Sequence, residues 1–327
     1  LARPEGGYGM SEKAMTIKTM PQGDLLTSGH GACVGCGLST AVNNVLRILG
    51  PDTVVYAPAC CFLVFTAMYP TSALKLPFIY SAFENTGAVI SGLSAGFRRQ
   101  GKKVNVVGFA GDGGTFDIGL QAVTGAAERN DDVIYVCVDN EAYMNTGTQR
   151  SGSTPFGAWT TTTPVGKKVQ GKREHKKDMM AAIMAQDVPY AATLSIAHMN
   201  DFVRKVEKAK SMEGFRFLHI MTPCNSGWKT EPSATYDLAR LAVETGMWTL
   251  YEIENGEKRI TYRPKEMMPV ENYLRLQGRF KHMSKEDVEI LQKWLCKKWN
   301  KSYNVGMVSE PVREKELAYE GEQGEGI

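Results

Sequence analysis

The segment VNVVGFAGDGG, residues 104–114, decides the fold: a nearly continuous apolar run leads directly into glycines around a single aspartate. Such a run, without alternating polar residues, is typical of a strand buried on both faces of a parallel sheet. Residues 117–129 then favour a helix, and residues 133–138, VIYVCV, form a second buried run. This alternation predicts the α/β class, with a doubly wound, mostly parallel sheet.

The alternation continues on both sides of this segment, which extends the predicted sheet. Near the end of the chain, Asn255-Gly256 favours a hairpin turn, and Ser284 with Asp287 resembles a helix-capping pair. The remaining predicted elements are helices over 39–49, 86–100, 177–186, 201–212 and 236–246, strands over 53–57, 190–195 and 215–221, and a hairpin over 248–263.

The pattern divides the chain into four predicted regions. They are an N-terminal arm (1–28), a cofactor-binding domain (29–245), a C-terminal appendage of hairpin plus helix (246–308) and an acidic tail (309–327). Within the domain, residues 141–170 are polar and have no period. A loop of that length in a compact domain usually serves function.

Composition excludes several classes of protein. The net charge of +3 over 327 residues is too small for a nucleic-acid-binding surface. No apolar run approaches the ~20 residues that span a bilayer, so we expect no membrane contact. Residues 1–7 lack the apolar core of a secretion signal, which predicts a cytoplasmic protein. In that reducing compartment, the seven cysteines indicate metal or redox chemistry rather than disulfides.

The glycines that follow the strand suit a phosphate ligand. Gly111, Gly113 and Gly114 lie between a buried strand and a helix, the place where open α/β sheets bind ligands. Without side chains, they let the backbone approach an anion. Asp112 would repel a phosphate directly, so we expect it to bind Mg²⁺ that bridges to the phosphate oxygens.

The next strand supplies further oxygen ligands. Asn140 follows that strand, 140 − 112 = 28 residues after Asp112, and emerges at the same predicted edge. Its side-chain oxygen and the carbonyl of Ala142 could complete the Mg²⁺ shell. A plain turn at Gly-Asp-Gly, with Asp139-Asn140 as a strand-end cap, is the alternative.

Gly111-Asp112-Gly113 followed by Asn140 resembles the diphosphate-binding motif of thiamine-diphosphate enzymes. That resemblance implies thiamine diphosphate as cofactor. It also implies that Asp112, Asn140 and the carbonyl of Ala142 hold the Mg²⁺.

Five cysteines lie before the first predicted helix or after predicted strands: Cys33, Cys36, Cys60, Cys61 and Cys224. Four thiolates gathered at one sheet edge fit a [4Fe–4S] cluster. A Cys₄ zinc site and a thioredoxin-type redox pair remain alternatives. Cys137, inside a strand, and Cys296, in the last helix, are expected to be buried apolar residues.

Three segments resemble the β subunit of the pyruvate:ferredoxin oxidoreductases: GHGACVGCG (29–37), DNEAYMNTG (139–147) and STPFGAWT (153–160). The similarity extends from about residue 25 to about residue 260. It implies a [4Fe–4S] cluster and places Asn145 near the substrate. The implied cluster ligands are Cys33, Cys36, Cys61 and Cys224.

Two departures from the family pattern bear on the substrate. Cys60 stands where the family usually has glycine, and Phe62-Leu63 replace a more polar pair. We expect both changes to add bulk or apolar character near the cofactor.

The resemblance implies oxidative decarboxylation of a pyruvate-type 2-oxoacid to acyl-CoA and CO₂, with electrons passing through the cluster. It implies an α subunit that supplies the glutamate facing the cofactor's pyrimidine, and ferredoxin-like or γ/δ subunits that accept electrons. Phenylglyoxylate, a branched oxoacid and oxalate are alternative substrates. A zinc-stabilised scaffold subunit without catalysis is the remoter alternative.

Overall fold

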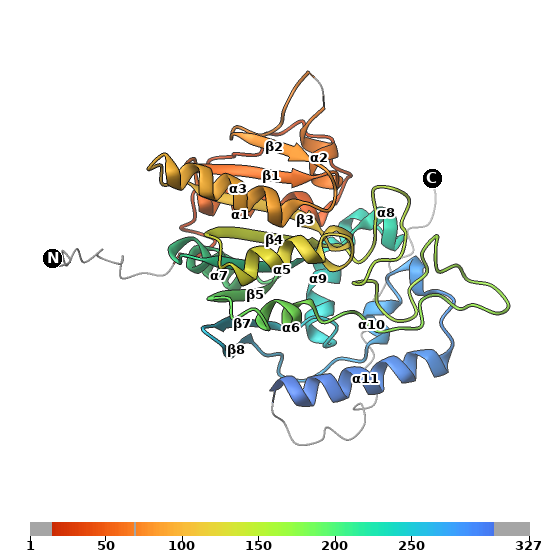
Figure 1. The fold of residues 1–327 in the computed structure, drawn as a ribbon. Coiled ribbons are helices and arrows are strands. Elements are labelled where there is room, and N and C mark those ends of the chain that lie inside the picture. Colours follow the sequence, from red (N-terminus) through yellow and green to blue (C-terminus); the bar gives the residue numbers. More distant parts are fainter. Residues whose placement is uncertain (1–14, 69, 304–327) are drawn as a thin grey trace.

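The computed structural model describes residues 15–68 and 70–303. Its centre is an eight-stranded sheet with the order β2-β1-β3-β4-β6-β5-β7-β8. The predicted acidic tail and the first half of the predicted arm lie outside the described residues. Figure 1 shows the sheet with helices on both sides.

The predicted α/β class with a mostly parallel sheet is confirmed. Neighbouring strands from β2 to β5 are parallel, whereas β7 and β8 are antiparallel to their neighbours. The strands are β1 (Thr53–Pro58), β2 (Phe78–Ser81), β3 (Asn105–Gly111), β4 (Val133–Asp139), β5 (Tyr190–Ser195), β6 (Phe215–Met221), β7 (Leu250–Glu254) and β8 (Glu257–Tyr262).

The helices agree with most predicted positions to within a few residues. They are α1 (Gly37–Leu49), α2 (Cys61–Thr66), α3 (Thr86–Arg99), α4 (Asp112–Phe116), α5 (Leu120–Glu128), α6 (Met179–Met184), α7 (Met199–Ser211), α8 (Asn225–Trp228), α9 (Thr235–Glu244), α10 (Glu271–Leu274) and α11 (Lys285–Tyr303), with short 3₁₀ turns η1 (Pro232–Ala234) and η2 (Gly278–Phe280). Ser284 caps α11 as predicted, since its Oγ accepts a 3.1 Å hydrogen bond from the Asp287 N–H.

The helix predicted over 117–129 is present as α5, which begins three residues later than predicted. A separate short helix, α4, precedes it, and the chain turns between the two. At the turn Gly119 lies so close to Gly114 that a Cβ atom on Gly119 would lie 2.0 Å from the Gly114 carbonyl oxygen. This close approach is incompatible with one continuous helix.

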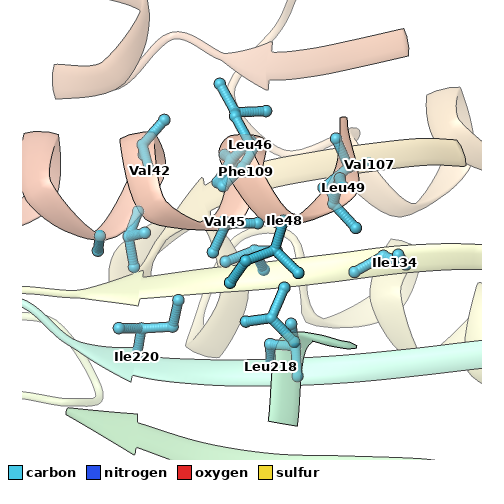
Figure 2. Packing of buried hydrophobic residues seen from close by; sticks show 14 of the residues in the cluster. Val42, Val45, Leu46, Ile48, Leu49, Val107, Phe109, Ile134, Leu218 and Ile220 are labelled. Carbon is cyan, nitrogen blue, oxygen red and sulfur yellow. The ribbon is translucent and has the colours of Figure 1, made fainter. Parts of the chain in front are cut away.

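Each face of the sheet is covered by helices. On one face α1 and α7 pack together over β3, β4 and β6, and Figure 2 shows Val45 and Ile48 of α1 above Ile134 and Leu218 of the sheet. On the other face α3, α5 and α6 enclose a second buried cluster. Because both faces are covered, β4 is buried along its whole length.

The predicted hairpin is part of the main sheet. It turns at Asn255 (φ 48°) and Gly256 (φ 85°), the left-handed pair that a tight hairpin needs. Its first strand, β7, pairs with β5, so the hairpin forms the edge of the sheet.

The boundaries of the four predicted regions stay a prediction. α10, η2 and α11 pack on a third buried cluster beside this edge, around Trp228 and Trp248. Within the described residues, no helix is both long and apolar enough to cross a membrane.

Candidate functional site

The parallel strands bring the predicted site residues to a common edge of the sheet. Cys61 follows β1, Asp112 follows β3, Asn140 follows β4, and Cys224 follows β6. These strands are neighbours in the sheet order, and their carboxyl ends lie together. In Figure 1 this edge also carries α2, α8 and the long connection between β4 and α6.

Three oxygen atoms converge at this edge. The side-chain oxygen of Asn140 lies 2.9 Å from the carbonyl oxygen of Ala142 and 3.1 Å from Oδ1 of Asp112. Rotating the amide by 180° would let its NH₂ group donate to both oxygens. With the oxygen inward, the trio is a set of acceptors facing one another, and oxygens are the ligands that Mg²⁺ prefers. The donor set therefore fits the expected metal ion.

The electrostatics of Asp112 also suit a cation. Burial, together with the neighbouring Asp139 carboxylate, raises the pKa of Asp112 well above its usual range. Asp139 is buried too, yet Lys176 and His219 hold its pKa below the usual range. Asp139 is therefore the ionised member of the pair. A divalent cation beside Asp112 would favour its ionised form.

The predicted glycines divide into two groups. Gly111 and Gly113 line a cavity of about 50 Å³ at this edge, and a Cβ atom on Gly111 would meet nothing within 4 Å. A Cβ atom on Gly113 would lie 2.4 Å from the ring of Tyr143, so this position needs glycine. Gly114 does not line the cavity; it packs under Phe83.

Asn145 is exposed at the wall of the same cavity, together with several residues that sequence reasoning did not single out. These include Leu38, Phe83, Tyr143 and Met144. A larger groove of about 580 Å³ lies between the arm and α1, and none of the predicted site residues line it. The small cavity is therefore the candidate site.

Backbone contacts bring the cysteine segments together. The N–H of Gly31 donates a 3.0 Å hydrogen bond to the carbonyl of Phe65, which joins the first cysteine loop to α2. The N–H of Gly37 donates to the carbonyl of Pro223 at 3.2 Å, which joins that loop to the Cys224 segment. Gly35 has φ 72°, and a Cβ atom there would lie 2.4 Å from a carbonyl oxygen of Pro232.

The predicted cluster ligands act on one another electrostatically. Burial raises the pKa of Cys61 to about 12, and the other neighbouring thiols, Cys60, Cys224, Cys36 and Cys33, add to this shift. Burial also raises the pKa of Cys224 to about 11, with further contributions from Cys36 and Cys33. A cationic group among these thiols would favour their thiolate forms.

Within residues 15–68 and 70–303, no group of three or more His, Cys, Asp or Glu side chains is arranged to hold a metal ion. The oxygen trio falls outside that description because it contains an amide and a backbone carbonyl. The cysteines act on one another electrostatically but form no such group among the described residues. Cys137 is buried, as predicted for an apolar residue, and Cys296 is half-buried.

Of the two departures from the family pattern, only Cys60 faces the site. Cys60 lines the cavity, but Phe62 and Leu63 do not. Phe62 is fully buried in the core, where its ring packs 5.1 Å from that of Phe109. The expectation that Phe62 adds apolar bulk near the cofactor is therefore wrong, because the first turn of α2 directs it into the core. The expectation for Leu63, which is half-buried, stays a prediction.

The long connection after β4 supplies charged and polar support that the sequence did not reveal. Ser151 donates a hydrogen bond to Asp112, and Ser153 donates one to Asp139. Lys176 lies 2.7 Å from a carboxylate oxygen of Glu141. The one available signal was the length and polarity of the loop.

The chain is similar to several known proteins. Residues 59–220 match the family described as "Thiamine pyrophosphate enzyme, C-terminal TPP binding domain". The chain is 50% identical over 277 residues to the pyruvate synthase subunit PorB of Methanothermobacter marburgensis, covering 84% of this chain and 96% of that one. It is 47% identical over 291 residues to the ketoisovalerate oxidoreductase subunit VorB of Pyrococcus abyssi, covering 86% and 94%.

The fold is also similar to that of a solved structure. It is the 2-oxoglutarate:ferredoxin oxidoreductase from Magnetococcus marinus, with a TM-score of 0.53 and 20% sequence identity over 70% of this chain and 84% of that chain.

Proposed function

Because the chain belongs to the thiamine-diphosphate-binding β subunits of the 2-oxoacid:ferredoxin oxidoreductases, we propose that it carries out oxidative decarboxylation of a 2-oxoacid to acyl-CoA and CO₂, with electrons leaving through a [4Fe–4S] cluster. The observation that carries this proposal is the convergence of oxygens from Asp112, Asn140 and Ala142. It lies at the same sheet edge as Cys61 and Cys224.

The oxygen trio is the proposed Mg²⁺ site. Asp112 supplies a charged ligand, while Asn140 and the carbonyl of Ala142 supply neutral ones. The open backbone at Gly111 accepts the diphosphate, while Gly113 leaves room for the Tyr143 ring and Gly114 packs under Phe83. Thiamine diphosphate, when bound there, supplies the carbanion chemistry that releases CO₂ from the 2-oxoacid.

The four thiols Cys33, Cys36, Cys61 and Cys224 are the proposed cluster ligands. The support for a shared site is that the thiols of Cys33, Cys36 and Cys224 all contribute to the raised pKa of Cys61. Cys33 and Val34 are exposed, which provides a surface where a ferredoxin-like or γ/δ subunit could accept electrons.

A partner α subunit completes the site. The cavity of about 50 Å³ is well below the roughly 300–1,000 Å³ of pockets that enclose a cofactor-sized ligand. Asp112 is the sole carboxylate among the residues that line this cavity, and in this proposal another chain supplies the glutamate that faces the pyrimidine. Exposed apolar side chains on the neighbouring segments support a covered surface, among them Val64 (50% exposed), Met68 (61%) and Tyr80 (60%).

The proposed substrate is a pyruvate-type 2-oxoacid, with a branched 2-oxoacid as the second candidate. Relatives named for each substrate are similarly close to this chain, at 50% and 47% identity. In this proposal Asn145, which is exposed at the cavity wall, hydrogen-bonds the substrate's keto oxygen or carboxylate. Cys60 narrows the same cavity where a glycine would leave it open.

The test is anaerobic purification of the full chain with its partner subunits, followed by metal analysis and assay. We expect a brown protein with four irons for each copy of this chain, and CoA-dependent reduction of a viologen dye. The substrate panel is pyruvate, 2-oxoisovalerate, phenylglyoxylate and oxalate, and Asp112→Asn is the inactive comparison. Zinc in a colourless complex, or equal activity of Asp112→Asn, would contradict the proposal.

A further inference from the structure

The turn that presents the oxygen trio has an unusual backbone. Glu141, between Asn140 and Ala142, has φ 69°, a left-handed conformation that is strained for a residue other than glycine. Its N–H donates a 2.9 Å hydrogen bond to Asp139, and its carbonyl accepts one of 2.6 Å from Thr154. The flanking oxygens converge only while this turn is held.

The side chain of Glu141 is held by two cations from distant parts of the chain. Its carboxylate is 2% exposed and pairs with Lys176 at 2.7 Å and with Arg279 at 2.5 Å. Arg279, in η2, is itself 2% exposed, and Gln277 accepts a 2.9 Å hydrogen bond from its Nε. The short 3₁₀ turn η2, which lies outside the sheet, therefore contacts the turn that carries the proposed metal ligands.

Arg279 also supports the other side of the turn. Its guanidinium lies 4.0 Å from the ring centroid of Trp228. The indole N–H of Trp228 donates a 2.8 Å hydrogen bond to the carbonyl oxygen of Asn140. One buried arginine thus contacts Glu141 directly and Asn140 through a single intervening ring.

A buried ion pair is weak evidence for stability alone, because apolar replacements of similar size are often equally stable. Its position under a strained turn points to another role. We propose that Glu141 and Arg279 are positioning residues, which set Asn140 and Ala142 in the geometry that Mg²⁺ requires. This inference rests on the proposed function of the oxygen trio as the metal site.

The test compares three variants in the full chain, purified with its partner subunits. Glu141→Gln and Arg279→Met remove one charge of the pair, and Arg279→Lys keeps the charge but loses the planar guanidinium. The matched control is Lys205→Met, which breaks the buried pair between Lys205 (1% exposed) and Asp201 (8% exposed) on α7, away from the site. The readouts are the Mg²⁺ dissociation constant with thiamine diphosphate present, followed by tryptophan fluorescence, and the melting temperature.

We expect Glu141→Gln and Arg279→Met to weaken Mg²⁺ binding by about 10- to 100-fold, the usual effect of losing a group that orients metal ligands. Arg279→Lys should lie between wild type and Arg279→Met. Lys205→Met should lower the melting temperature as much as Arg279→Met while leaving the Mg²⁺ affinity within twofold. Excess Mg²⁺ should restore cofactor binding in Arg279→Met.

Two results would overturn the inference: wild-type affinity in both Glu141→Gln and Arg279→Met, or an equal loss of affinity in Lys205→Met. A wild-type complex that binds no Mg²⁺ with thiamine diphosphate would instead overturn the proposed function of the site. If Arg279→Met does not fold, Arg279→Lys and Glu141→Gln decide the question, and wild-type affinity in both counts against it.

Discussion

The indole N–H of Trp228 donates a 2.8 Å hydrogen bond to the main-chain carbonyl of Asn140. Trp228 ends α8, the short helix whose N-cap is Cys224. The side-chain sulfur of Cys224 accepts a 3.4 Å hydrogen bond from the N–H of Gly227 in the same helix. A single turn of helix therefore joins a proposed cluster ligand to the proposed metal site.

Trp228→Phe should weaken the metal site without removing the cluster. Phenylalanine keeps the ring under Arg279 but loses the N–H, which leaves the buried Asn140 carbonyl without its donor. We expect a loss of about 1–3 kcal/mol in unfolding free energy. Thiamine diphosphate binding should fall by about tenfold, measured by titration, while the iron content stays at the wild-type value.

Trp248→Phe is the control for that substitution. Trp248 is also buried, but its indole N–H has no hydrogen-bond partner among the described residues. Its replacement by phenylalanine removes no hydrogen bond. A cofactor affinity reduced equally in both variants would show that ring size, not the donor, matters at Trp228.

Cys61→Ser should lose the cluster, whereas Cys60→Ser should retain it. Burial raises the pKa of Cys61 to about 12, and electrostatic interactions with Cys33, Cys36 and Cys224 contribute to this shift. The pKa of Cys60 is raised by burial, but none of those three cysteines contributes to its shift. Iron analysis and the paramagnetic resonance of the reduced protein separate the two variants. If Cys60→Ser loses its iron and Cys61→Ser retains it, Cys60 rather than Cys61 is the third cluster ligand.

Asn145→Ala should weaken the binding of the substrate and leave the binding of the cofactor unchanged. Its side chain is exposed at the cavity wall, and its amide can hydrogen-bond the oxoacid. We expect KM for the 2-oxoacid to rise by about tenfold, the worth of one hydrogen bond of about 1.4 kcal/mol. Thiamine diphosphate affinity should stay unchanged. An unchanged KM would leave Asn145 with a role in loop order only.

The sequence was sufficient where the physical signal is local. The sequence predicts a strand over residues 215–221, and β6 occupies the same range, because five of its seven residues are apolar, as expected of a strand buried on both faces. The meeting of Asp112 and Asn140 also follows from sequence, since parallel strands in one sheet end at one edge.

The missed features depend on contacts between distant segments. Glu141 and Arg279 are 138 residues apart, and no local pattern links them. The hairpin turn at Asn255-Gly256 was recognisable, but its pairing with β5 was not, because a hairpin pattern does not specify which sheet edge it joins. Phe62 was misjudged for the same reason: its neighbours Phe78 and Phe109 belong to other elements.

Glu252→Gln should make the protein less stable at neutral pH and less sensitive to acid. Glu252 is buried on β7, accepts a 2.9 Å hydrogen bond from Tyr190, and pairs with Lys208 and Arg259. Burial alone would raise the pKa of Glu252, but Arg259, Tyr190 and Lys208 lower it below its ordinary value of 4.5.

A carboxylate whose pKa is lowered by folding adds stability above its unfolded pKa, and this contribution disappears as the pH falls through the folded pKa. The two proteins should therefore differ by about 1–3 kcal/mol in unfolding free energy at pH 7 and converge below the folded pKa of Glu252. Urea unfolding followed by circular dichroism at each pH measures the difference. Glu254→Gln is the control, because Glu254 is 44% exposed and its pair with Lys208 should be worth at most about 1 kcal/mol. If the unfolding free energies of wild type and Glu252→Gln differ by the same amount down to low pH, the lowered pKa of Glu252 is contradicted.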